Sequence, residues 1–277
     1  MMSRKAIDRG IHITISILLW LGTLVVFVPV FILIITSLKN TKEAKIIGLT
    51  LPETLQFENF AIVWEKGLIV QGFVNSLLIA VPCVLLIVFA SALMSYYLAR
   101  RNARSTYPMY VFVVAGIIKP IPLVTTFLLL QQLHLLNTRA GVMLVLAGTL
   151  ISLATFVYVG FIKGIPRELD DAAAIDGCGP FRTFWTIIFP LLKPCTFTIV
   201  ILMLLNVWND GQAALFFLGN SDYWTMPLNI YRFFGYFRTE WNYVFGCIIL
   251  MTLPVFITYL FGQRYIIDGM VAGSVKG

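Results

Sequence analysis

Charged residues are scarce in this sequence: Asp, Glu, Lys and Arg together make up only 12% of its 277 residues. Hydrophobic residues make up 59%, and the mean hydropathy is +0.90. A water-soluble domain of this length would need far more polar surface, so the composition predicts a polytopic membrane protein. The net charge of +7 comes from basic residues scattered over loops, without the clustered basic face that a nucleic-acid partner would require.

Residues for catalysis and metal binding are also few. His12 and His134 are the only histidines, and none of the four cysteines forms a CxxC pair, so no metal site is expected. No set of nucleophile, base and orienting group stands out, which argues against a membrane-bound enzyme. The chain also lacks a G-x4-G-K-[ST] phosphate loop, so it is not expected to hydrolyse ATP itself or to hold a cofactor.

Long apolar segments are abundant, and six of them reach the roughly 20 residues that a bilayer-spanning helix needs. They cover residues 11–36, 71–99, 108–132, 140–163, 194–218 and 243–264. The first exceeds a signal-peptide core of roughly 7–15 residues and lacks a small-residue cleavage site, so it is read as a retained span. The pattern predicts an all-α membrane protein with six transmembrane helices in a single domain, residues 1–277.

The loops between these segments predict the orientation. Basic residues are more numerous in the set of loops that contains both termini, residues 100–104 and residues 163–193. The positive-inside rule places that set, and therefore both termini, in the cytoplasm. On the opposite side, residues 219–242 are rich in aromatic residues, which fits either an interfacial anchor or a docking surface for a partner that delivers a ligand.

The loop over residues 166–190 is charged, rich in alanine and broken by glycine. Its carboxylates would be too costly in lipid, so it belongs in the cytoplasm. Pro166 fits the first position of a helix, and Gly177 ends that helix before Pro180 starts a second short one. Glu168 and the acidic residues after it complement the helix dipole. The pattern alone leaves two readings open: an ordinary capped helical hairpin, or a docking surface for another protein.

This loop resembles the EAA loop of bacterial ABC importer permeases, whose pattern is E-A-A-x3-G-x9-I-x-L-P. Asp171–Ala173 is followed by three residues and Gly177, then by nine residues and Ile187–Pro190. Asp171 replaces the Glu of the pattern, and Phe189 replaces the Leu. Asp171 keeps the charge but is one methylene shorter, which could weaken or reposition a salt bridge to an ATPase.

The resemblance extends over nearly the whole chain. Residues 135–141, 208–210, 226–228 and 263–277 look like carbohydrate-importer permeases. The last of these segments is similar to the tail of the second membrane subunit of the maltose and multiple-sugar importers. The chain is thus similar to a binding-protein-dependent permease that imports a sugar or oligosaccharide across the bacterial cytoplasmic (inner) membrane as a multi-pass protein.

The resemblance implies several partners: a homologous second permease in a heterodimer, two ATP-binding subunits that hold ATP and Mg, an extracytoplasmic solute-binding protein and membrane lipid. It also implies two contacts with the ATPase. The residues expected to couple the loop to it are Glu168, Asp171, Ala172, Ala173, Gly177, Ile187 and Pro190. The tail, residues 265–277, is expected to reach the ATPase through Gly273, Ser274, Val275, Lys276 and Gly277.

Polar residues within the spans are candidates for the translocation path, because such residues usually face a bundle interior or a wet cavity. Asn206, Asn209 and Asp210 are spaced to share one helical face beside Trp208, which suits a sugar's hydroxyls and ring. Hydrogen bonding to a neighbouring helix would explain Asn206 equally well, whereas the family resemblance favours the path for Asn209 and Asp210. Lys119 falls within the third span, where it either pairs with a buried carboxylate such as Asp210 or recognises an acidic substrate.

Two alternative functions stay open. Lys119 hints at a charged or phosphorylated substrate, such as glycerol-3-phosphate or an acidic oligosaccharide. A self-contained secondary transporter is less favoured, because Asp210 is the only carboxylate within the spans that could couple an ion and no inverted repeat is evident.

Overall fold

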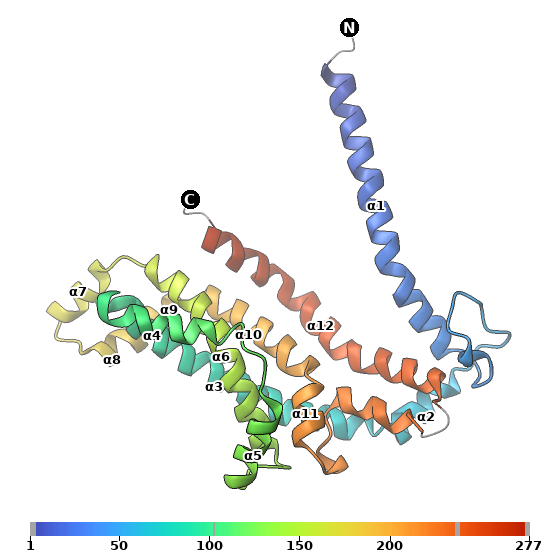
Figure 1. The fold of residues 1–277 in the computed structure, drawn as a ribbon. Helices are drawn as coiled ribbons and strands as arrows, with labels where there is room; N and C mark the ends of the chain where they lie inside the picture. The colour runs from blue at the N-terminus through green and yellow to red at the C-terminus, as the bar shows by residue number, and fades with distance from the viewer. Residues whose placement is uncertain (1–3, 102, 236–238, 275–277) are drawn as a thin grey trace. The chain divides into compact units, whose positions relative to one another are not determined.

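The protein was analysed as a computed structural model, which describes residues 4–101, 103–235 and 239–274 (Figure 1). Apart from an isolated β-bridge between Phe234 and Thr239, these ranges contain helices and connecting segments and no strand, which confirms the all-α prediction. The α-helices are α1 (Arg4–Ser37), α2 (Glu58–Lys66), α3 (Ile69–Arg100), α4 (Ala103–Ala115), α5 (Leu123–Gln132), α6 (Arg139–Lys163), α7 (Glu168–Ile175), α8 (Pro180–Thr183), α9 (Phe189–Leu191), α10 (Lys193–Asn209), α11 (Gln212–Phe217) and α12 (Trp241–Ser274).

Four helices within the described ranges are long and apolar enough to cross a membrane by themselves. They are Thr14–Ser37 within α1, all of α3, all of α6, and Trp241–Leu260 within α12. A fifth crossing is possible where the Pro180–Leu191 segment meets α10 at a bend of 78°. Four of the six predicted segments are therefore continuous helices, and α12 runs on to Ser274 instead of ending near residue 264.

The other two predicted segments are interrupted. Residues 108–132 are divided between α4 and α5 by the non-helical stretch 116–122, which contains Pro120 and Pro122. Proline lacks a backbone N–H and disfavours helical geometry in the residue before it, so two prolines this close together end the helix. Residues 194–218 are divided between α10 and α11 at Asp210. By contrast, α1, α3 and α12 continue through Pro29, Pro82 and Pro254.

The chain forms two compact units, which are described separately. The first comprises residues 1–69 with 229–250, and Asn59 of α2 joins the end of α1 to the start of α12 within it. The buried Asn59 amide donates to the carbonyl oxygens of Ser37 (2.7 Å) and Lys39 (2.9 Å), and its oxygen accepts from Asn242 (3.2 Å). Lys39 is 1% exposed and donates to Thr50 Oγ1 at 2.8 Å. These bonds give the Asn59 amide and the Lys39 ammonium hydrogen-bond partners under the loop that follows α1.

The second unit, residues 70–228 with 251–277, holds the main core between α3, α6 and α10. Small residues such as Ala80, Ala147 and Ala154 are buried there, which lets the helix backbones approach closely. Polar side chains add specific links between helices: Tyr158 Oη donates to Thr196 Oγ1 at 2.9 Å.

The end of this unit near residues 221–224 is organised around Asn75, a buried side chain on α3. Its amide nitrogen donates to the carbonyl oxygens of Asp222 (2.8 Å) and Trp224 (3.0 Å). Its oxygen accepts from Arg139 Nε (3.1 Å) and Nη2 (2.7 Å), and the Arg139 guanidinium lies over the Tyr223 ring at 4.5 Å. One side chain therefore joins α3, the start of α6 and the turn that contains residues 221–224.

We expect Asn75→Ala to lower the free energy of unfolding by about 2–4 kcal/mol, because it removes four hydrogen bonds of one buried side chain, two to backbone carbonyls and two from Arg139. Gln71→Ala is the matched control, since Gln71 makes a single exposed bond to the same Asp222 carbonyl. Thermal unfolding of the purified, detergent-solubilised protein measures both variants. Equal shifts for the two would contradict the central role of Asn75.

Candidate functional site

The loop between α6 and α10 contains the predicted pair of short helices, α7 and α8, followed by a π-helical segment, Phe184–Ile188, and α9. Glu168 opens α7, so Pro166 is not the first helical residue as predicted, and Arg167 occupies the cap position. Acidic side chains do fill the first turn, where they stabilise the helix through its dipole.

Gly177 ends α7 in the left-handed conformation, with φ of +74°. The Cys178 N–H donates to the Ala173 carbonyl (2.8 Å) and the Gly177 N–H to the Ala174 carbonyl (3.1 Å). This is the Schellman arrangement, in which a glycine beyond the helix end lets backbone groups cap the last turn. The predicted turn at Gly177 is therefore confirmed, and it sets the direction in which α8 leaves α7.

The two alanines of the predicted coupling sequence face different ways. Ala173 is buried, whereas Asp171 and Ala172 are exposed. Ile175 is 87% exposed and Phe181 of α8 is 68% exposed, so the loop presents apolar side chains beside its carboxylates. An exposed apolar patch with a charged border is typical of a protein-docking surface. Of the other predicted coupling residues, Glu168 and Pro190 are exposed and Ile187 is half-buried.

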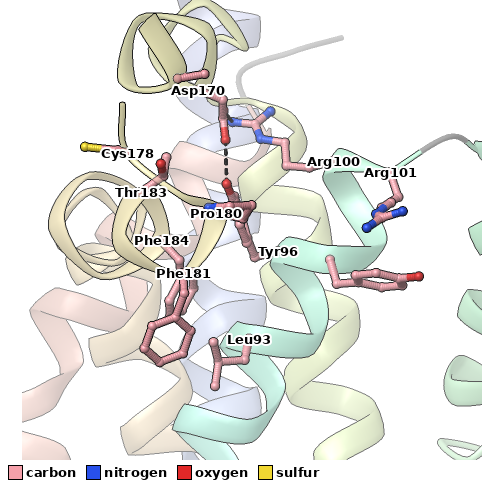
Figure 2. A pocket seen from close by; sticks show the side chains of 12 residues that line it. Leu93, Tyr96, Arg100, Arg101, Asp170, Cys178, Pro180, Phe181, Thr183 and Phe184 are labelled. Atoms are coloured by element: carbon pink, nitrogen blue, oxygen red, sulfur yellow. Dashed lines mark hydrogen bonds and ion pairs between the residues drawn. The ribbon is translucent and has the colours of Figure 1, made fainter. Parts of the chain in front are cut away.

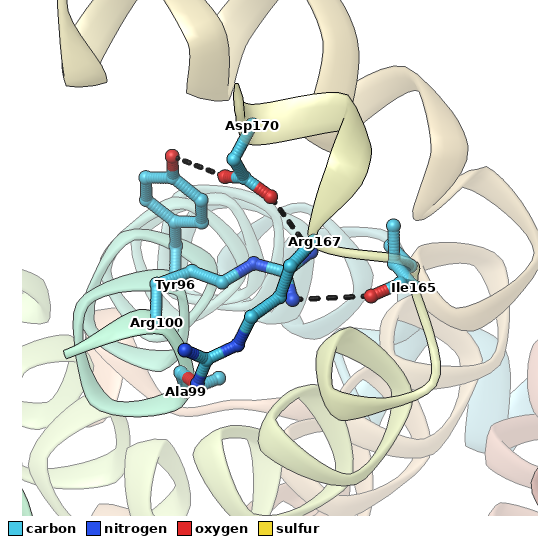
Figure 3. Close-up of polar contacts among 6 residues, drawn as sticks. All are labelled: Tyr96, Ala99, Arg100, Ile165, Arg167 and Asp170. Carbon is cyan, nitrogen blue, oxygen red and sulfur yellow. Dashed lines mark hydrogen bonds and ion pairs between the residues drawn. The ribbon is translucent and has the colours of Figure 1, made fainter. Parts of the chain in front are cut away.

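Asp170 holds this loop on the end of α3 (Figure 3). Tyr96 Oη donates to Asp170 Oδ1 at 2.8 Å, and Arg100 Nη2 lies 3.0 Å from Asp170 Oδ2. Arg100 also donates from Nη1 to the Ile165 carbonyl at 3.1 Å. One guanidinium therefore contacts both α7, through Asp170, and the segment that precedes α7, through Ile165. The side chains of Arg100 and Asp170 are only 12% and 20% exposed, which strengthens their attraction relative to an ion pair in water.

Sequence reasoning missed this role of Asp170. It assigned the residue to the helix dipole alone, because its partners lie far away in the sequence on α3. The cytoplasmic position predicted for both Arg100 and Asp170 was the only signal that they could meet.

An aromatic cluster holds the second half of the loop. The ring centroids of Phe184 and Trp185 lie 5.1 Å apart, those of Trp185 and Phe189 also lie 5.1 Å apart, and Phe89 of α3 is 5.8 Å from Phe189. Such edge and tilted pairs add roughly 0.5–1.5 kcal/mol each beyond burial. The Phe189 that departs from the EAA pattern is therefore part of the packing between this loop and α3.

A cavity of about 540 Å³ lies between the end of α3 and the loop (Figure 2). Its walls combine apolar side chains, including Leu93, Phe181 and Phe184, with the polar contact between Arg100 and Asp170. The anchoring contact thus borders open space instead of being sealed in the core.

The residues predicted for the translocation path are only partly brought together. Trp208 is buried, with its ring edge against Phe73 (5.6 Å), and lines an apolar cavity of about 110 Å³. Asn206 is exposed and donates to the Leu202 carbonyl of its own helix at 2.8 Å. Asn209 is the exposed last residue of α10.

Asp210 does not share their helical face, because α10 ends at Asn209 and the Asp210 backbone is extended. The Asp210 carboxylate instead accepts a hydrogen bond from the Ala213 N–H at 2.8 Å, in the first turn of α11. This contact caps a helix and gives Asp210 a structural role that the predicted continuous span had concealed.

Lys119 lies in the non-helical break between α4 and α5, not within a helix. Its side chain is exposed and borders a cavity of about 350 Å³ with Pro120, Pro122 and Thr149. Within the described residues, no ion pair joins it to Asp210.

The predicted ATPase-contacting tail is only partly described. Gly273 and Ser274 belong to the backbone of α12. Val275, Lys276 and Gly277 lie outside the described residues.

Comparisons with known proteins identify the class. Residues 73–270 match the family described as binding-protein-dependent transport system inner membrane component, and the chain belongs to this family. It is 33% identical to the probable starch degradation products transport system permease protein AmyC of Thermoanaerobacterium thermosulfurigenes, over 97% of this chain and 99% of that protein. It is also 33% identical to the melibiose/raffinose/stachyose import permease protein MelC of Bacillus subtilis, over 91% and 92% of the two chains.

A solved structure supports the fold. A chain from a bacterial ABC transporter involved in the import of the acidic polysaccharide alginate matches with a TM-score of 0.79 at 20% identity, covering 96% of this chain and 99% of that one. The family and the apolar helices together place this protein in the cytoplasmic membrane as a multi-pass transport subunit.

Gly177→Ala tests the helix end. A Cβ at residue 177 meets no atom within 4 Å, so the expected cost of about 1–2 kcal/mol comes from the positive φ alone. Gly179→Ala is the matched control: residue 179 also has open space but a φ of −71°. Hydrogen exchange of the α7 amides should rise in the first variant only, and equal exchange in both would contradict the assigned role.

Asp170→Asn tests the anchor. The asparagine keeps an acceptor for Tyr96 but removes the charge that pairs with Arg100, so we expect local opening of α7 to become easier by about 1–3 kcal/mol. Asp171→Asn makes the same chemical change at an exposed neighbour in the same first turn, so it removes a similar dipole contribution of about 0.3–1 kcal/mol and should raise hydrogen exchange much less. If Asp171→Asn loosened α7 as much, the contact with α3 would not be what holds the loop.

Proposed function

We propose that this chain is a permease subunit of an ATP-driven, binding-protein-dependent importer of a sugar or oligosaccharide. The observation that carries the proposal is the match along nearly the full length of relatives named as permeases for starch degradation products and for melibiose, raffinose and stachyose. The architecture of the loop between α6 and α10 supports it, because an importer without its own phosphate loop needs a docking surface for an ATPase.

The topology that fits this function has six crossings, with both termini in the cytoplasm. The interrupted segments, α4 with α5 and α10 with α11, would then each make one crossing. Breaks of this kind are tolerated within a membrane where the freed backbone groups face protein or a water-filled cavity. Lys119 and Asp210 both lie at such breaks, which supports a polar path near them.

The proposed coupling surface consists of the exposed side of α7 and α8. Asp171 would offer a charge to the ATP-binding subunit, Ala172 would permit close approach, and Ile175 and Phe181 would enter an apolar cleft. The partner assembly has a homologous second permease, two ATP-binding subunits that hold ATP and Mg, and an extracytoplasmic solute-binding protein that delivers the substrate. The end of α12 would make a further contact with the ATPase.

The mechanism is alternating access driven by partners. Nucleotide binding changes the ATPase subunits, and the conformation of the permease that fits them better becomes populated. If the loop moved independently of α3, the ATPase's preference for one loop position would not change the conformation of the membrane helices. The contact of Asp170 with Arg100 and Tyr96 makes displacement of α7 a displacement of α3, a helix of 32 residues.

One observation favours a second candidate, an acidic substrate. The Lys119 side chain borders a cavity without a carboxylate among its lining residues, so its charge is available to an anion. The same cavity has hydroxyl groups at Thr126 and Thr149 that could bind a neutral sugar.

The assembled importer, reconstituted with its solute-binding protein, tests both candidates through its ATPase rate. Neutral oligosaccharides should stimulate the rate when the binding protein is present. Stimulation confined to uronate-containing or phosphorylated substrates would establish the second candidate instead. Failure of the chain to associate with any ATP-binding subunit would contradict both.

Lys119→Gln separates the two candidates within the path. For a neutral sugar we expect uptake to stay within about twofold of wild type, since an exposed charge contributes little. For an acidic sugar we expect the rate at low substrate concentration to fall roughly tenfold, because a charged hydrogen bond is lost. Uptake by the reconstituted importer, with Lys66→Gln as an exposed control outside the path, provides the measurement.

A further inference from the structure

A further cavity lies on the side of α3 that faces α4 and α6. Its volume is about 230 Å³, and three cationic residues line it: Arg101, Lys163 and Arg167. Tyr107 and Tyr110 of α4 complete its polar rim. Arg101 also lines the larger cavity beside Arg100 and Asp170, as Figure 2 shows.

The cavity has no carboxylate among its lining residues. Its cations contact neutral groups instead: the Arg101 guanidinium lies over the Tyr97 ring at 5.3 Å, and Lys163 Nζ lies 5.5 Å from the centre of the Tyr110 ring. Arg167 Nη2 donates to the Ala99 carbonyl at 3.5 Å (Figure 3). Nearby, the Asp170 charge is already paired with Arg100. Three like charges around one hollow repel one another, and an anion placed there would relieve that repulsion.

The position of the cavity defines the environment of that anion. The two candidate spans α3 and α6 end at Arg100 and Lys163, next to the cavity, so it lies where apolar spans meet the aqueous boundary. Tyrosines and basic residues gather at this level in membrane proteins. Further along α4, Met109 is 46% exposed and Phe112 is 81% exposed, which provides an apolar surface leading away from the cations.

We propose that this cavity binds the phosphate headgroup of an anionic phospholipid, with the acyl chains lying along α4. Basic pockets between membrane helices bind such headgroups through the combined charge of their lysines and arginines. The apolar face of α4 favours a lipid over a free phosphate ion, because it adds contact area that only acyl chains would use. Arg167 directly precedes α7, so the bound headgroup also holds the base of the coupling loop.

The test is lipid retention by the assembled importer in neutral detergent, measured by native mass spectrometry. Phosphatidylglycerol is titrated against phosphatidylcholine, and wild type should retain the anionic lipid preferentially. Arg101→Gln combined with Lys163→Gln should weaken its binding by roughly twenty-five-fold, since each cation near a membrane surface contributes about fivefold. Arg101→Lys combined with Lys163→Arg keeps the charges and should retain most of the binding, which excludes a folding defect.

Lys66→Gln, an exposed cation outside the cavity, controls for general charge. Glycerol phosphate and inorganic phosphate are tested as competitors, and both should displace the lipid from the cavity only weakly. Three outcomes would overturn the proposal: equal retention of the two lipids, undiminished retention by the Gln double variant, or displacement of the lipid by inorganic phosphate at similar concentrations. None of these outcomes depends on which substrate the importer carries.

Discussion

The contact that joins Asp170 to Arg100 and Tyr96 is the constraint on which the rest of this structure depends. It links two segments that lie far apart in the sequence, the end of a long membrane helix and a short exposed loop. Because Arg100 also binds the Ile165 carbonyl, the loop is held at its base as well as through α7. A solvent-exposed ion pair would contribute little to stability, but this one is largely buried and is flanked by two hydrogen bonds, from Tyr96 to Asp170 and from Arg100 to the Ile165 carbonyl, which fix its geometry.

This anchoring explains why the loop can expose apolar side chains without collapsing. The inward side of α7 is occupied by Asp170 and Ala173, and the Schellman turn at Gly177 directs α8 back toward α3, where Phe184 packs against Tyr96. Ile175 and Phe181 are left outside, available to a partner. The same end of α3 also carries Arg101, so the proposed docking surface and the proposed lipid site share one rigid support.

The sequence predicted the helices and turns that depend on neighbouring residues, and it missed the contacts between residues far apart in the sequence. Apolar runs identified α1, α3, α6 and α12, and the Pro–Gly pattern located α7, α8 and the turn at Gly177, because hydrophobicity and backbone preference act over neighbouring residues. Apolar character alone concealed the breaks at 116–122 and at Asp210. The first break follows from the closely spaced Pro120 and Pro122. The second depends on the hydrogen bond from the Ala213 N–H to Asp210, which can be recognised as a helix cap only once α10 is known to end at Asn209. The Asp170 anchor escaped prediction because no periodicity connects residue 170 with residue 100.

The central claim is that the exposed side of α7 docks on an ATP-binding subunit. Cross-linking at Ile175 tests it most directly. The assembled importer contains Ile175→Cys together with Cys178→Ser, which removes the native thiol of the loop. A short thiol-reactive cross-linker is attached at position 175. The account predicts a covalent product with the ATP-binding subunit whose yield changes with nucleotide, and no such product for Phe112→Cys on the membrane face of α4. Equal yields at the two positions, or no product at Ile175→Cys in an intact complex, would contradict it.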